Sequence, residues 1–192
     1  MTSKIKVVAI SGGLKNPSRT HALANALTSA LASHAQIEIR LIDLGEIGPR
    51  FAGVLQPDDL PAEVRSAIRA IEGADFIVAA TPVYRASFTG LFKHLLDFVD
   101  HNALIDVPVL LAATGGSDRH ALVIDHQLRP LFSFFQSFTL PVGVYASEAD
   151  FENYQVSSAA LRQRIELAVE RALPFVRPRV GANVSQQVRV AA

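Results

Sequence analysis

The stretch KIKVVAISGGLKNPSRT, residues 4–20, contains a strand, a glycine turn and the approach to a helix. Residues 4–10 are apolar and rich in β-branched side chains, which is typical of a buried strand, and the glycine pair that follows predicts a loop. Residues 20–33 carry leucines at positions 23, 27 and 31, a spacing that places them on one face of a helix. The chain therefore begins with the order strand, loop, helix.

The same alternation continues along the chain. We expect further strands at 37–44, 75–80, 107–113 and 138–145, a long loop at 45–60, and further helices at 61–72, 89–99, 120–136 and 157–176. Most of these strands are apolar almost throughout, which indicates a parallel sheet covered by helices on both faces. Right-handed crossovers then favour a three-layer α/β sandwich with a five-stranded parallel sheet of order 2-1-3-4-5.

The bulk composition limits the classes of function. The 192 residues suit one domain, which we place at 1–176, followed by a tail at 177–192 that we expect to be flexible. The 18 basic and 18 acidic side chains cancel, so no overall field attracts nucleic acid or a membrane surface. Cysteine is absent, so electron transfer would need a bound cofactor. No signal peptide or membrane-spanning stretch is recognisable, which predicts a cytoplasmic protein.

A sheet of this order binds ligands beyond the carboxyl ends of its first, third and fourth strands. The loop after the first strand, 11–20, combines glycines with hydroxyl donors, an arginine and a helix start; the candidate phosphate ligands are Ser11, Ser18, Arg19 and Thr20. The simpler alternative is that Ser18 or Thr20 only caps the helix. The motifs GxxxxGK[ST] and GxGxxG are absent, so a monophosphate fits better than a nucleotide triphosphate or a dinucleotide.

The loops 81–88 and 114–120 offer contacts for a planar ligand. In the first of them Pro82 fixes the backbone, while Tyr84 and Arg85 provide an aromatic wall and a cation. The second opens with two glycines that allow close backbone approach. No serine nucleophile elbow and no metal-binding histidine pair is present, so we predict neither a catalytic triad nor a metal site.

Three motifs together resemble the NADPH-dependent FMN reductase family, which has a flavodoxin-like fold. They are SGGLKNPSRT (11–20), ATPVYRASFTGLFKHLLD (80–97) and ATGGSDRHALVIDHQLRPLF (113–132), and the similarity covers about residues 4–175. Within the family the motifs are most similar to the reductase components of two-component alkanesulfonate and methanesulfonate monooxygenases. The resemblance implies an NAD(P)H:FMN oxidoreductase that supplies reduced flavin to a partner flavin-dependent monooxygenase.

The resemblance also implies roles for individual residues. Ser11, Ser18, Arg19 and Thr20 would hold the FMN phosphate, Pro82, Val83, Tyr84 and Arg85 would contact the isoalloxazine, and Thr114, Gly115, Gly116 and Ser117 would line its other edge. NADPH would stack on the flavin and deliver hydride to N5, without an obligatory catalytic side chain. The choice between NADPH and NADH stays open, because no clamp for the 2′-phosphate can be singled out.

One departure from the family pattern lies at His126. Monooxygenase-linked members carry an inserted aromatic residue, usually Tyr, that forms a π-bulge at a tetramer interface; here the matching residue is His126. The alternative is an ordinary exposed helix residue. Together with the broad apolar surface of helix 89–99, this predicts a homodimer or homotetramer. Two other functions remain open: a quinone or azo reductase that keeps its FMN, and a flavodoxin-like electron carrier.

Overall fold

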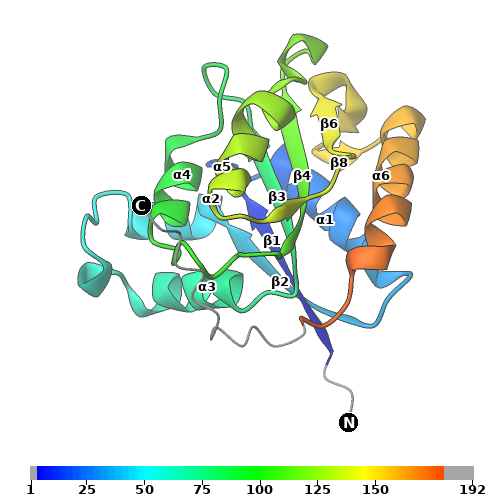
Figure 1. Ribbon diagram of the computed structural model, residues 1–192. Coiled ribbons are helices and arrows are strands. Elements are labelled where there is room, and N and C mark those ends of the chain that lie inside the picture. The colour runs from blue at the N-terminus through cyan, green and yellow to red at the C-terminus, as the bar shows by residue number, and fades with distance from the viewer. Residues whose placement is uncertain (1–3, 180–192) are drawn as a thin grey trace, which may run out of the picture.

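A parallel sheet runs through the middle of the protein, between two layers of helices (Figure 1). The structure is a computed structural model that describes residues 4–179. The strands are β1 (Ile5–Ser11), β2 (Ile37–Asp43), β3 (Phe76–Pro82), β4 (Pro108–Gly115), β5 (Phe138–Thr139) and β6 (Val144–Ser147). Their order is β2-β1-β3-β4-β5, with β6 also paired to β4, and every pairing is parallel. The predicted order 2-1-3-4-5 is confirmed.

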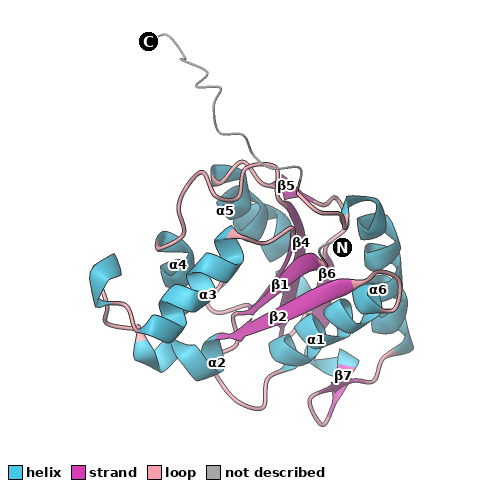
Figure 2. Ribbon diagram, turned by 90° about the horizontal axis from the view of Figure 1, so that it is seen from below, coloured by secondary structure: helices cyan, strands magenta, loops and turns pink. Residues whose placement is uncertain are grey.

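Helices cover both faces of the sheet, as Figure 2 shows. They are α1 (Arg19–Ala32), α2 (Leu44–Ile47), α3 (Ala62–Glu72), α4 (Gly90–Asp97), α5 (Arg129–Phe134) and α6 (Ala159–Ala172). The apolar faces of α1 and α6 pack on one side of the sheet, whereas α3, α4 and α5 pack on the other. Side chains of one strand alternate between the two cores: Val7 and Ala9 face α1, and Val8 and Ile10 face α3 and α4. The predicted three-layer sandwich is therefore confirmed.

The last part of the sheet differs from the expected single strand at 138–145. Val109 is paired with Thr139 but Ala112 with Val144, so the outer strand carries two extra residues between β5 and β6. Pro141 lies in this break, where it has no N–H to donate to the ladder. As a result, pairing with β4 resumes two residues later than in an unbroken strand, and β6 ends at Ser147, opposite Gly115 at the carboxyl end of β4.

The expected helix at 120–136 is also interrupted. A 3₁₀ turn at Asp118–His120 is followed by a π-helix at Ile124–Leu128 and only then by α5. The amide of Arg129 donates to the carbonyl of Ile124, five residues earlier, and Pro130 cannot donate to the carbonyl four residues before it. The π-helix contains His126, whose role at an interface stays a prediction.

Two regions differ in detail from what the sequence pattern indicated. The loop expected at 45–60 contains α2 and two 3₁₀ turns, Gly48–Arg50 and Pro57–Asp59. The region before α6 forms a hairpin of β7 (Phe151–Glu152) and β8 (Gln155–Val156), which the sequence pattern did not indicate.

The predicted tail is described only as far as Arg179. Its amide donates a hydrogen bond to Asp75, and its guanidinium donates to the carbonyls of Glu72, Ala103 and Ile105. Residues 180–192 lie outside the described residues.

Candidate active site

The carboxyl ends of β1, β3 and β4 meet at one edge of the sheet and surround a cavity of about 320 Å³. Nine of the twelve predicted ligand-binding residues line it: Ser18, Arg19, Thr20, Pro82, Val83, Tyr84, Thr114, Gly115 and Gly116. Three predicted residues, Ser11, Arg85 and Ser117, are not part of its lining. The three loops that the sequence analysis selected thus converge on one site.

The loop between β1 and α1 folds closely over the start of the helix. Ser18 is the N-cap of α1, and its Oγ accepts a hydrogen bond from the His21 amide at 3.2 Å. A Cβ on Gly13 would lie 2.3 Å from that same oxygen, so a side chain at this position would displace the capping hydroxyl. The first turn of α1 contains no acidic residue, so its partial positive charge is not neutralised from within the turn. This end of the helix suits an anion.

The hydroxyls predicted to bind the phosphate have different surroundings. Thr20 and Thr114 are buried, and their Oγ1 atoms lie 2.7 Å apart, which ties the first loop to the third. Ser11 is fully buried, and its Oγ has no hydrogen-bond partner within residues 4–179. The Ser18 hydroxyl both caps the helix and lines the cavity, so the alternative of simple capping holds for this residue without excluding a ligand.

Arg19 lies at the mouth of the cavity, and its side chain is 38% exposed. Its guanidinium forms an ion pair with Glu148 and lies over the Tyr154 ring, 5.3 Å from the ring centre. Both partners also line the cavity. The sequence analysis missed them because it considered only loops after the first, third and fourth strands. The feature that could have identified Glu148 is its position directly after β6, which is a parallel neighbour of β4.

The second loop is a tight turn with an uncommon backbone. The amides and carbonyls of Tyr84 and Ser87 bond to each other at 2.8 and 3.1 Å, and the two residues between them, Arg85 and Ala86, have φ values of 50° and 67°. Non-glycine residues rarely adopt this left-handed region, and such strain is concentrated at functional sites. The turn places Tyr84, which is 43% exposed, against the cavity.

The third loop needs glycine at one of its two positions. A Cβ on Gly115 would lie 2.2 Å from Tyr145 Oη, whereas a Cβ on Gly116 would meet no atom within 4 Å. Tyr145 Oη donates to the Ser117 carbonyl at 2.6 Å. Burial raises the pKa of Tyr145, and the negative charges of Asp118 and Asp150 raise it further, so the hydroxyl stays a donor at neutral pH. Gly115 makes room for this bond, and Gly116 leaves open space.

A second, smaller cavity of about 250 Å³ adjoins the first, since Val83 lines both. It also involves the π-helix, through His126 and Gln127. The Ser87 hydroxyl donates to Gln127 Oε1 at 3.0 Å and thereby connects the strained turn to the π-helix. Through Val83 and this hydrogen bond, the cavity at the carboxyl edge of the sheet is connected to the region of His126.

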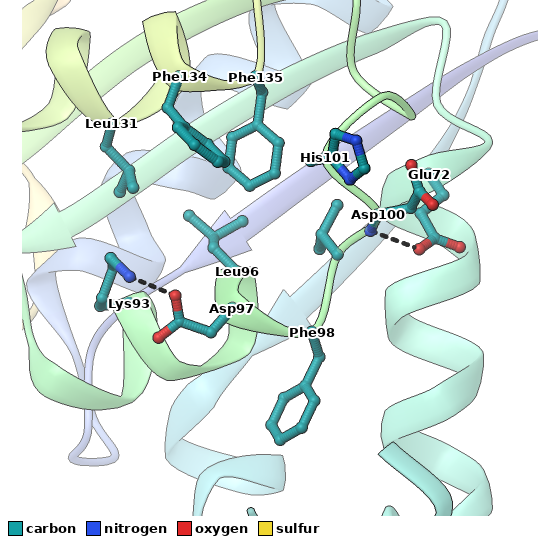
Figure 3. A pocket seen from close by; sticks show the side chains of 11 residues that line it. Glu72, Lys93, Leu96, Asp97, Phe98, Asp100, His101, Leu131, Phe134 and Phe135 are labelled. Carbon is teal, nitrogen blue, oxygen red and sulfur yellow. Dashed lines mark hydrogen bonds and ion pairs between the residues drawn. The ribbon is translucent and has the colours of Figure 1, made fainter. Parts of the chain in front are cut away.

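A larger cavity, about 680 Å³, lies elsewhere, between α4 and α5 (Figure 3). Leu96, Leu131, Phe134 and Phe135 supply much of its apolar wall, while Glu72, Asp97 and Asp100 lie among its polar groups. Its one lysine, Lys93, is already paired with Asp97. This wall offers few donors for an anionic ligand.

Residues 4–179 contain no group of three or more His, Cys, Asp or Glu side chains arranged to hold a metal ion. They also contain no helix that is long and apolar enough to cross a membrane.

Comparison with known proteins identifies the family. Residues 5–152 match the family model described as NADPH-dependent FMN reductase. The chain is 59% identical to the NADH-dependent FMN reductase SfnF of Pseudomonas fluorescens and 57% identical to an FMN reductase (NADPH) of Pseudomonas aeruginosa, in each case over 91% of this chain and 94% of the relative. The crystal structure of an oxidoreductase from Corynebacterium diphtheriae superposes with a TM-score of 0.81 at 32% identity, over 91% of this chain and 98% of that one. The chain belongs to the NADPH-dependent FMN reductase family, and the predicted enzyme class and its two cofactors, FMN and NAD(P)H, are confirmed.

Proposed function

We propose that the cavity at the carboxyl edge of the sheet binds FMN, with the flavin phosphate at the start of α1. The observation that carries this proposal is the convergence of nine predicted residues from three separate loops on one cavity. An arginine, a threonine hydroxyl and a helix start without acidic residues in its first turn lie together at one end of it. Phosphate dianions bind well to such a combination.

The rest of the cavity suits the flavin ring. Tyr84 and the rigid Pro82–Val83 backbone supply one wall, and Gly115 and Gly116 supply a wall without side chains. FMN held there would supply the redox chemistry, as an acceptor for hydride from NAD(P)H at N5. The protein would bind and orient the two reactants. We predict that none of its side chains is required as an acid or a base.

The flavin is proposed to be an exchangeable substrate rather than a permanent group. Arg19 and Tyr84 are both partly exposed, so the phosphate and one part of the ring would remain accessible at the surface. Reduced FMN would then leave for a separate flavin-dependent monooxygenase, in the cytoplasm, where NAD(P)H is formed. An enzyme that retained its flavin would instead reduce quinones or azo compounds directly.

The experiment that tests this function is steady-state oxidation of NADH and of NADPH by protein stripped of flavin. We expect the rate to rise hyperbolically with added FMN and to saturate. Activity that rises with a quinone but not with repeated additions of FMN would show that the flavin is retained. The same assay measures which of the two nicotinamide nucleotides is preferred.

We further propose that the protein is a homo-oligomer and that the face between α4 and α5 forms a contact. Phe134 is 69% exposed and lines the large cavity of Figure 3. Its ring packs edge-on against that of Phe135, with the ring centres 5.3 Å apart. Exposed apolar surface of this kind marks interaction sites. The adjoining π-helix, with His126, is proposed to contribute to a second contact in a tetramer.

A further inference from the structure

Arg19, the proposed phosphate ligand, already has a negatively charged partner inside the protein. Glu148 follows β6 directly and forms an ion pair with the Arg19 guanidinium. Its side chain is 61% exposed and lines the same cavity as Ser18 and Thr20. A carboxylate therefore faces the end of the cavity where the proposed function places a phosphate dianion.

The segment that carries Glu148 is held firmly in place. Asp150 accepts hydrogen bonds from the Ser147 amide at 2.9 Å and from Arg164 at 3.0 Å. Burial raises the pKa of Asp150, but the hydrogen bonds from Ser147 and Ser158 and the charge of Arg164 outweigh burial and lower the pKa below its usual value. Asp150 thus stays ionised at neutral pH and fixes the turn at Glu148–Asp150.

The hairpin that follows fixes the other face of Arg19. Asn153 and Tyr154 connect β7 to β8 with φ values of 48° and 61°, a conformation that suits a two-residue hairpin turn but is uncommon for tyrosine. Tyr154 is 44% exposed, and Arg19 lies over its ring. The guanidinium thus lies between an aromatic ring and a carboxylate.

We propose that Glu148 is an internal counterion that competes with the FMN phosphate for Arg19 and so lowers the affinity for FMN. This inference rests on the proposed function, because it assumes that the phosphate binds at Arg19. A dianion beside Glu148 is repelled by the carboxylate, and it gains less from a guanidinium that is already paired. When the flavin leaves, Glu148 pairs with Arg19 again, so departure does not leave an unpaired cation. Glu148 is a residue that determines how readily the flavin exchanges, and it acts only on its phosphate.

The test compares FMN with riboflavin, which has the same ring and no phosphate. Both dissociation constants are measured by quenching of flavin fluorescence, for the wild-type protein and for Glu148→Gln, which keeps the shape and removes the charge. We expect Glu148→Gln to bind FMN more tightly by about two- to fivefold, the range of an exposed ion pair, and riboflavin with unchanged affinity. The gain should shrink when the salt concentration is raised, because salt screens the repulsion.

Glu152→Gln is the matched control, since Glu152 lies on the hairpin that follows the Glu148–Asp150 turn, is exposed and does not line the cavity. It should leave both affinities unchanged. Weaker or equal binding of FMN by Glu148→Gln would overturn the proposal, because Glu148 would then orient Arg19 or be irrelevant. Equal affinity of the wild-type protein for FMN and riboflavin would refute the phosphate site itself, and with it the proposed function.

Discussion

Two of the cavities formed by residues 4–179 differ in both size and lining. The cavity between α4 and α5 has about 680 Å³ and an apolar wall, whereas the cavity at the carboxyl edge of the sheet has about 320 Å³ and is lined by Arg19, threonine hydroxyls and glycine backbone. Volume reflects how side chains happen to pack on a surface. A binding site needs donors in the right place, and parallel strands and the start of a helix bring these to one edge. Two experiments test the roles of these two cavities, and two more test how the rim of the smaller one is built.

The largest expected effect is on flavin binding, from Arg19→Ala. Loss of a charge-assisted hydrogen bond should weaken FMN binding by about 1.5–3 kcal/mol, or roughly 10- to 150-fold in Kd. Riboflavin binding should change little, and flavin fluorescence titration measures both. Arg50→Ala is the control, because Arg50 forms an exposed ion pair with Glu63 and lines neither cavity. An unchanged FMN titration of Arg19→Ala would remove the phosphate from the smaller cavity.

The next effect concerns the larger cavity. Phe134→Asp places a charge on the proposed contact between subunits and should reduce the molar mass measured by light scattering, to about half if a dimer contact is lost. FMN binding per chain should persist. Leu167→Asp is the control on the opposite side of the sheet, since Leu167 is 45% exposed on α6. Equal masses for Phe134→Asp and the wild type would show that this face is not a contact.

A third comparison is made within the smaller cavity. Gly115→Ala should destabilise the protein by about 1–3 kcal/mol, because its Cβ would collide with the Tyr145 hydroxyl. Gly116→Ala should leave the free energy of unfolding nearly unchanged, because its Cβ meets open space. Urea unfolding followed by circular dichroism measures both. If the two variants lost equal stability, the strict requirement for glycine would not be specific to position 115.

The smallest effect is the pH dependence of stability at the same rim. The pKa of Tyr145 is raised above its value in the unfolded chain, so its contribution is fully present below the unfolded pKa and is lost as the pH rises through the folded pKa. Stability of the wild type should therefore fall more steeply above pH of about 10 than that of Tyr145→Phe. Thermal unfolding at several alkaline pH values measures the difference. Parallel profiles for the two proteins would show that the hydroxyl does not titrate in a distinct environment.

The parts of the fold that could be predicted are those that depend on local patterns. A strand buried on both faces, such as β1, is apolar almost throughout, and a helix buried on one face, such as α1, carries leucines at a helical spacing. The strand order and the layers could therefore be inferred from the alternation of these two patterns along the chain. The break at Pro141 was not predicted, whereas the π-helix at Ile124–Leu128 agrees with the π-bulge that the family resemblance implied at His126 but that the helical pattern alone did not indicate. Proline removes a single hydrogen bond, and the sequence does not show how the neighbouring residues will rearrange around the loss.

The sequence predicted candidate site residues on the loops after the first, third and fourth strands. It missed Glu148 and Tyr154, which line the cavity only because distant segments of the chain meet there. Arg19 was recognised from its place at a helix start, but its pairing with Glu148 spans 129 residues of sequence. The contact depends on where β6 ends after the break, and hence on the packing of the last strand against β4.

The order of the strands, the family and the choice of loop 11–20 as the candidate anion site follow from the sequence, because periodicity, glycine turns and short motifs are local properties. The folded structure was needed to show that Arg19 contacts both Glu148 and Tyr154, that a side chain would collide at Gly115 but not at Gly116, and that the larger cavity lies away from the candidate site. Each of these depends on distances between residues that are far apart in the chain, and such distances are set by the packing of the helices and the sheet.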